Sequence, residues 1–185
     1  FQAGIGAKST ITQAGRSNAI YIDQLVGSDG SSWTVTQTTM PSAAHTRNIA
    51  RVTQSAADNT SGVQQGGFNG LATVNQSGPG NDSTIAQIGT VSYGTGVVSN
   101  SATVTQSGAD NGSDVSQNGA LNSATVDQSG SDNLAKVTQT GTGNESDILQ
   151  SGTLNSATVT QSSNNNVSGI IQSGTGGTVT VTQGF

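Results

Sequence analysis

Glutamine recurs at a spacing of 11 residues over most of this chain. Self-similarity at a fixed period is the signature of a repeat architecture, in which each unit packs against its neighbours. Three longer intervals interrupt the series, but sixteen glutamines keep the same place in the repeated unit. These are Gln2, Gln13, Gln24, Gln37, Gln54, Gln65, Gln76, Gln87, Gln106, Gln117, Gln128, Gln139, Gln150, Gln161, Gln172 and Gln183.

A fixed pattern of residues precedes each of these glutamines. Val or Ile stands two residues before the glutamine in all 15 units that extend that far back. Ala or Ser stands four residues before it in 12 of the 15 units, and Asn stands six before it in 11. Residues two apart point to the same face of a strand, so these positions share one face. The asparagines of the unbroken C-terminal series are Asn100, Asn111, Asn122, Asn133, Asn144, Asn155 and Asn166.

Each unit is predicted to be a short strand followed by a tight turn. The period of two and the β-branched residue in every unit exclude a helix. Glycine predominates two residues after the glutamine, where we expect it to supply the positive φ that a tight turn needs. These glycines include Gly108, Gly119, Gly130, Gly141 and Gly152.

The 15 charged side chains avoid the glutamine-bearing face. Because an unpaired buried charge is very costly, this segregation predicts that the face is buried. Asp114 and Lys136, 22 residues apart, are expected to form a weak surface ion pair. Asp110 and Asp132 have the same separation and are expected to repel each other in successive turns.

One strand cannot bury this face alone, but two successive units that fold back on each other can. The sequence therefore predicts an all-β fold, a β-solenoid of strand-turn-strand rungs with about 22 residues per rung and about eight rungs. Identical residues would stack about 4.8 Å apart in a cross-β amyloid architecture. Side-chain amides of Asn and Gln are expected to hydrogen-bond along each column, which satisfies the buried polar groups.

The whole chain, residues 1–185, is expected to form a single solenoid domain. The longer intervals predict loop insertions near 25–30, 38–47 and 88–99 that leave the register of the core unchanged. Trp33 occupies an inward position normally held by Ala or Ser, and Ile20 holds the equivalent position one unit earlier. We expect a wider rung there, with the residues between Leu25 and Gly30 accommodating it.

The repeat resembles the curlin repeat of curli, the functional amyloid of bacterial biofilms. The motif Gln-x-Gly-x-x-Asn-x-Ala-x-Val-x-Gln is complete from Gln117 to Gln128 and from Gln150 to Gln161. The resemblance implies a major fibre subunit that is exported to the cell surface or biofilm matrix and contributes to cell adhesion. It also implies a minor nucleator curlin and the curli secretion channel as partners.

Polymerisation is the activity that the ends of the sequence predict. The last strand, TVTVTQGF, is in phase, uncharged and strongly β-prone, and Gln2 is in phase at the other end. An unpaired strand edge recruits another chain, so we expect head-to-tail stacking of terminal rungs into a homopolymer. The phased glutamines and asparagines would then form ladders that continue across the junction between subunits.

Composition argues against most other functions. Only 8% of the residues are charged and the net charge is −5, so no basic surface is available for nucleic acid. No apolar run approaches the roughly 18 residues of a membrane span, and FQAGIGAKST lacks the regions of a signal peptide. His45 stands alone in an insertion and the chain has no Cys, so we expect no enzyme, metal or cofactor. Calcium between Asp110 and Asp132 is a minor alternative, because the calcium-binding β-roll signature is missing.

The rival interpretation is a monomeric secreted β-solenoid, such as an ice-binding protein or an adhesin stalk. Outward Thr-x-Thr pairs occur at Thr103/Thr105 and Thr158/Thr160, as on an ice-binding face. Charged or bulky residues interrupt both arrays, which disfavours a flat ice-matching surface. An adhesin stalk would share the fold and differ only at its ends.

Overall fold

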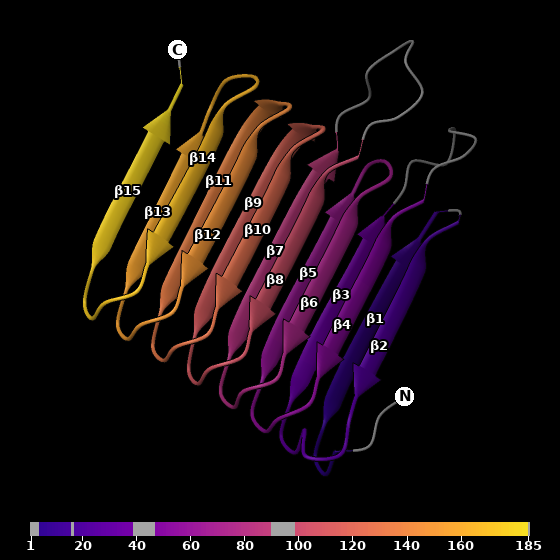
Figure 1. Ribbon diagram of the computed structural model, residues 1–185. Coiled ribbons are helices and arrows are strands. Elements are labelled where there is room, and N and C mark those ends of the chain that lie inside the picture. Colours follow the sequence, from indigo (N-terminus) through magenta and orange to yellow (C-terminus); the bar gives the residue numbers. More distant parts are fainter. Residues whose placement is uncertain (1–3, 16, 39–46, 90–98, 185) are drawn as a thin grey trace.

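The computed structural model describes residues 4–15, 17–38, 47–89 and 99–184. Within these residues the chain forms 15 β-strands and no helix. Successive strands alternate between two parallel sheets that lie face to face (Figure 1). The predicted all-β solenoid is confirmed, with seven two-stranded rungs and one further strand, β15, among the described residues. Gln2, the first glutamine of the series, lies outside them.

The odd-numbered strands form one sheet of eight strands, called here the odd sheet. In spatial order they are β1 (Lys8–Ala14), β3 (Ser32–Thr38), β5 (Thr60–Gly66), β7 (Asp82–Gly89), β9 (Gly112–Ala120), β11 (Leu134–Thr142), β13 (Ser156–Gln161) and β15 (Thr178–Gln183).

The even-numbered strands form the facing sheet of seven strands, called here the even sheet. In spatial order they are β2 (Ala19–Gln24), β4 (Ile49–Gln54), β6 (Leu71–Gln76), β8 (Ser101–Gln106), β10 (Ser123–Gln128), β12 (Glu145–Gln150) and β14 (Val167–Gln172).

Every strand pair places equivalent repeat positions side by side. In the even sheet, Val126 lies beside Val104 on one neighbour and Ile148 on the other. The longer sequence intervals leave this register unchanged: Gln87 and Gln117 are 30 residues apart but still bond to each other. Most of the predicted insertions 38–47 and 88–99, with His45, lie outside the described residues.

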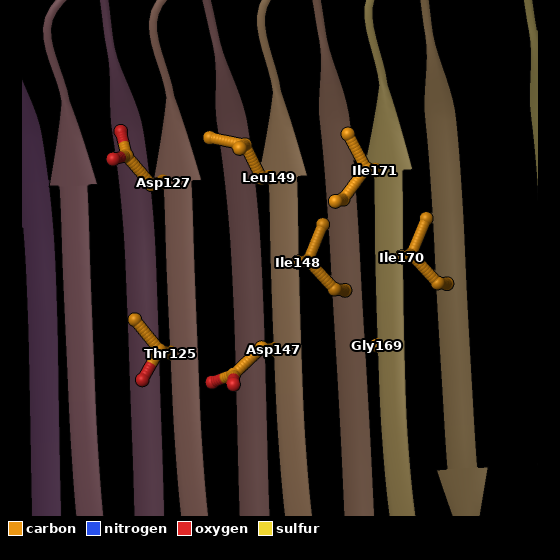
Figure 2. Close-up of a pocket in the computed structure, with 8 residues that line it drawn as sticks. All are labelled: Thr125, Asp127, Asp147, Ile148, Leu149, Gly169, Ile170 and Ile171. Carbon is orange, nitrogen blue, oxygen red and sulfur yellow. The ribbon is translucent and has the colours of Figure 1, made fainter.

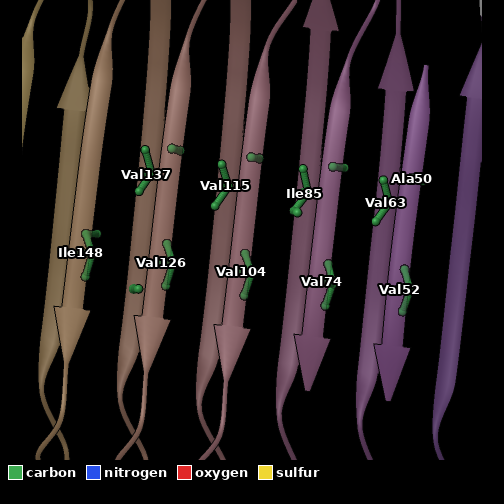
Figure 3. Close-up of a cluster of buried hydrophobic side chains, with 14 of the residues drawn as sticks. Ala50, Val52, Val63, Val74, Ile85, Val104, Val115, Val126, Val137 and Ile148 are labelled. Carbon is green, nitrogen blue, oxygen red and sulfur yellow. The ribbon is translucent and has the colours of Figure 1, made fainter. Parts of the chain in front are cut away.

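The hydrophobic core is a narrow band of small and β-branched side chains between the sheets. Val104, Val115, Val126 and Val137 are fully buried there, each from a successive strand (Figure 3). Trp33 is 7% exposed and packs in the same cluster, against which Ile20 is partly buried. The seven residues from Leu25 to Ser31 connect β2 to β3, the strand of Trp33.

Charged side chains within the described ranges are all exposed or half-exposed, as the sequence predicted. Asp114 and Lys136 stand side by side on β9 and β11, with 3.5 Å between the Lys136 Nζ and the Asp114 Oδ2. The predicted surface ion pair is therefore confirmed. The dry interior holds polar groups but no ionised ones among the described residues.

The corners of the solenoid are of two kinds. The expected positive φ at the glycine two residues after the glutamine occurs in one kind and not in the other. After odd-sheet strands, Gly119 and Gly141 have φ of 126° and 108°, as predicted. After even-sheet strands, Gly108, Gly130 and Gly152 have no positive φ. The left-handed residue there is the fourth after the glutamine: Asp110, Asp132 and Leu154, with φ of 55°, 56° and 58°.

Glycine in the even-sheet corners is required by close stacking. A Cβ on Gly130 would collide with the carbonyl oxygen of Gly152, which belongs to the next corner along the stack. The same relation joins Gly108 to Gly130 and Gly152 to Gly174. A Cβ on Gly174 would meet nothing within 4 Å, because its corner is the last of the series.

Candidate self-assembly ladders and open ends

The glutamines form two continuous hydrogen-bonded ladders through the interior, one in each sheet. Each Gln Nε2 donates to the Oε1 of the glutamine on the following strand of its sheet, at 2.7–3.0 Å. The odd ladder runs from Gln13 to Gln183, and the even ladder runs from Gln24 to Gln172. All 15 predicted ladder glutamines that fall within described residues are therefore brought together in these two columns.

The ladder amides from Gln24 to Gln161 also make a second hydrogen bond to the backbone. The Gln128 Nε2 donates to the carbonyl of Gly112 at 3.0 Å, and the Gln139 Nε2 donates to that of Ser123 at 2.8 Å. These carbonyls begin strands of the facing sheet, so the glutamines also bond the two sheets together. A primary amide has two N–H donors, and both find acceptors in the interior of the stack. This satisfies groups that would otherwise be costly to bury.

The asparagine columns bond differently from the amide-to-amide pattern that we expected. The Asn111 Oδ1 accepts the backbone N–H of Asn133 at 3.0 Å, and the Asn100 Oδ1 accepts that of Asn122 at 3.1 Å. Direct amide contacts occur in part of the columns, as from Asn133 Nδ2 to Asn111 Oδ1 at 3.1 Å. The asparagines therefore act mainly as stacked caps of the corners.

The seven predicted asparagines occupy equivalent sites at the starts of successive strands. Six of them are buried, and Asn166 is half-buried near the C-terminal end of the stack. The Nδ2 groups of Asn133 and Asn155 donate to the corner carbonyls of Gly152 and Gly174, both at 2.8 Å. Each asparagine thus connects its own corner to the next.

Inward-facing side chains are exposed on the first and last described strands of the stack. All seven residues of β1 are exposed, and the inward-pointing Ile11 has 54% of its surface accessible. At the other end, Val179 on β15 points inward but is 36% exposed. Each of these strands has a pairing partner on one side only among the described strands.

The ladders also end in complementary groups. Each ladder donates toward the C-terminal end, so the Oε1 of its first described glutamine is an acceptor with no ladder donor among the described residues. The Gln24 Oε1 is such an acceptor: the residue is 0% exposed, and this oxygen has no hydrogen-bond partner. At the C-terminal end, the Gln183 Nε2 donates to the Val167 carbonyl at 3.0 Å and keeps its second N–H for another acceptor.

The described ranges contain neither a metal-binding cluster nor a membrane-spanning helix. No group of three or more His, Cys, Asp or Glu side chains gathers there in a way that could hold a metal. No helix of the described chain is long and apolar enough to cross a membrane. Gly169 opens a groove on the outer face of the even sheet, beside Asp147, Leu149 and Ile171 (Figure 2).

Comparison with known families identifies the repeat. The family model described as the curlin associated repeat matches three times, at residues 108–141, 130–162 and 155–184. Residues 108–184 of this chain are therefore built of curlin repeats. A search of curated proteins found no match. The curlin repeat and the all-β solenoid fold are typical of structural proteins.

Proposed function

We propose that this curlin-repeat chain is the self-assembling subunit of an extracellular curli-like amyloid fibre in a bacterial biofilm matrix. Subunits polymerise head to tail by stacking their terminal rungs. The observation that carries the proposal is that β1 and β15, the outermost strands of the odd sheet among the described residues, are largely exposed and pair on one side only, with a spare N–H on Gln183.

Strand edges with free backbone groups are templates for another chain. Here the edges are also matched in side chains, because most strands present the same inward series of residues. The contact between a C-terminal and an N-terminal rung is heterologous and does not close, so it extends into a filament. Fibre growth would therefore repeat the pairing that already holds the subunit together.

The family resemblance extends the proposal to partners. A minor nucleator curlin would present the first template rung, and the curli secretion channel would deliver the chain to the cell surface. The assembled fibres would support adhesion in the matrix. Coexpression of the chain with and without a nucleator, followed by imaging of the cell surface, tests these partners.

Electron microscopy and fibre diffraction of the purified chain test the polymer. We expect unbranched fibres with a meridional reflection at about 4.7 Å. A chain that stays monomeric at high concentration would overturn the proposal. It would favour the monomeric solenoid, which a thermal-hysteresis assay then checks for ice binding.

A matched pair of variants locates the growing surface. Val181 points inward on β15 and packs partly against the core, whereas its neighbour Thr182 points outward and is exposed. Val181→Lys would place a charge in the junction and stop elongation, because that charge loses its water when the next rung stacks. Thr182→Lys adds the same charge outside the junction, so its fibres should form at nearly the normal rate.

A further inference from the structure

We propose that the outer face of the even sheet docks a second copy of this chain, which lies face to face with the first and runs antiparallel to it along the stack. Tyr21 and Arg51 of each copy then contact Gly169 and Asp147 of the other. This surface lies within one subunit, so the inference goes beyond the proposed polymer and does not depend on it.

Gly169 leaves a notch in the outer face of the even sheet, on β14. The groove there measures about 490 Å³, and Asp147, Leu149 and Ile171 are among the residues that line it (Figure 2). A Cβ on Gly169 would meet nothing within 4 Å, so folding does not require glycine at this position. Glycine inside a strand often marks a place where another chain or a ligand approaches closely. The notch is therefore suited to a side chain that protrudes from another molecule.

A protruding aromatic side chain stands toward the other end of the same face. Tyr21 on β2 is 50% exposed, and Arg51 on the neighbouring β4 lies over its ring, with 5.3 Å from the guanidinium carbon to the ring centroid. Cation–π attraction at this distance holds the two side chains together. Arg51 makes no ion pair within the described part of the chain, so its charge is available to a carboxylate of another copy.

The two ends of this face carry opposite charge. Strands β10, β12 and β14 present three carboxylates and no basic residue on it. The carboxylates are Asp127, Glu145 and Asp147. Among the described residues at the other end, Arg47 and Arg51 outnumber the single carboxylate of Asp23. An antiparallel pair places the basic end of each copy on the acidic end of the other, which favours association.

One registration makes both contacts at once. Tyr21 and Arg51 are paired neighbours on β2 and β4, and Asp147 and Gly169 are paired neighbours on β12 and β14. All four stand three residues before a ladder glutamine, so they share one level across the sheet. Three described strands lie on each side of β8, so a twofold axis along β8 carries β2 onto β14 and β4 onto β12 (Figure 1). The interface is then isologous, and each contact occurs twice.

The parallel alternative, in which both copies run the same way along the stack, is disfavoured. It sets Arg51 against Arg51 and Asp147 against Asp147, and like charges in contact are costly. The face has seven described strands of six residues, which cover roughly 30 Å by 20 Å, or about 600 Å² per copy. A typical specific interface buries about 800 Å² per partner. We therefore expect a weak pair between subunits and stronger association where the contact repeats along two filaments.

Cross-linking of introduced cysteines detects such a weak pair, because the chain has no native Cys. In the antiparallel pair, outward Thr73 on β6 stands opposite Thr125 on β10 of the other copy, and the two copies of Thr73 are about 10 Å apart along the stack. Freshly purified Thr73→Cys and Thr125→Cys chains are mixed in equal amounts and treated with dibromobimane, a thiol cross-linker of short reach. We expect a covalent dimer from the mixture and only background from either variant alone.

Charge reversals then test the contact between Arg51 and Asp147. When Arg51→Glu is added to both cysteine variants, carboxylates face each other at both contacts, so the dimer should fall to background. When Arg51→Glu is added to the first variant and Asp147→Arg to the second, each contact regains one guanidinium and one carboxylate. This mixture should recover most of the product, although every chain in it carries a reversed charge.

A matched pair of glycine variants tests the notch. Gly169→Thr, added to both cysteine variants, fills the groove that Tyr21 enters, so the dimer should be lost. Gly62→Thr is the control, because Gly62 lies inside β5 on the outer face of the odd sheet, where a Cβ would be 3.9 Å from its nearest neighbour, the Thr84 Oγ1. Thr is favoured over Gly in strands, so both variants should unfold at or above the midpoint of the unmodified chain.

Three results would each overturn the inference. A dimer from Thr73→Cys alone would show that the copies run the same way. A dimer that ignores the charge reversals would show a contact elsewhere. No dimer from any mixture would show that this face stays empty or serves another kind of partner.

The test is separate from that of the proposed polymer, because the reaction uses soluble chain. Failure of the unmodified chain to form fibres contradicts only polymerisation, whereas loss of the charge-dependent dimer contradicts only this inference. Where fibres do form, micrographs give a second readout. Preformed Arg51→Glu fibres and preformed Asp147→Arg fibres should each stay separate and should bundle side by side when they are mixed.

Discussion

The Gln128 Nε2 donates to the Gln150 Oε1 over 2.9 Å, and the two residues are 22 positions apart in the sequence. The same amide also donates to the carbonyls of Gly112 and Asn133 at 3.0 and 3.1 Å. The Gln128 Oε1 accepts in turn from Gln106 at 2.9 Å. One side chain therefore joins neighbouring rungs and the two sheets.

Gln128→Glu should destabilise the fold by about 3 kcal/mol or more, because it removes the amide donors and buries a charge among acceptors. Urea unfolding of the monomer measures this loss. Gln64→Glu is the control, since Gln64 is an exposed residue on β5. Equal losses in the two variants would contradict the role of the ladder.

The Gln128→Glu variant should also depend on pH in a defined direction. Burial disfavours the ionised form, so the pKa of the introduced carboxyl rises above its usual value of about 4.3. The folded state then binds the proton more tightly than the unfolded state. The destabilisation should be smallest below about pH 4 and should grow as the pH rises through the folded-state pKa. The Gln64→Glu control should lack this dependence.

Alanine substitutions at two equivalent corner glycines should have different effects, one on folding stability and the other on fibre elongation. Gly130→Ala drives a Cβ into the Gly152 carbonyl and should cost about 1–3 kcal/mol of monomer stability. Gly174→Ala meets nothing in the monomer, so its unfolding midpoint should stay near that of the unmodified chain. Its elongation should slow, because the added methyl group meets the corner of the next subunit. Elongation of Gly174→Ala at the normal rate would contradict tight corner stacking at the junction.

Trp33 should tolerate loss of its polar atom better than loss of its volume. Its Nε1 is buried without an acceptor, so Trp33→Phe removes no hydrogen bond. Trp33→Ala leaves a cavity in the cluster and should cost about 3–5 kcal/mol. Thermal unfolding followed by far-UV circular dichroism compares the two variants. A larger loss in Trp33→Phe would contradict this account.

The surface pair Asp114 and Lys136 should contribute little to stability. Their side chains are 47% and 54% exposed, and exposed pairs are usually worth less than about 1 kcal/mol. A double-mutant cycle with Asp114→Asn and Lys136→Met should give a small coupling that disappears in about 1 M salt, where charges are strongly screened. A large coupling that resists salt would contradict a solvated pair.

The sequence was sufficient to predict the fold and the two glutamine columns. Gln54, Val52 and Ala50 recur two apart in an alternating pattern, and such a pattern fixes which face of a strand is buried. Because every unit repeats this pattern, the only pairing that keeps all faces buried aligns equal positions. That is the register found on β4 and its neighbours.

The corners could not be derived in the same way. Glycine at the second corner position suggested a positive φ. At Gly130, however, glycine is needed because a Cβ would collide with the backbone of the next corner. The left-handed conformation falls instead on residues such as Leu154, which single-residue preferences would not select. Stacking of successive corners decides both features, and that contact joins residues far apart in the sequence.

The constant register across intervals of different length has a practical consequence. β7 pairs with β9 from Asp82 to Gly89, although the connection between Gly89 and the start of β8 contains an insertion. Strand pairing therefore does not depend on the length of the segment between these strands. In the proposed fibre, a foreign peptide inserted in this segment would occur once per subunit and would be displayed at regular intervals along the fibre.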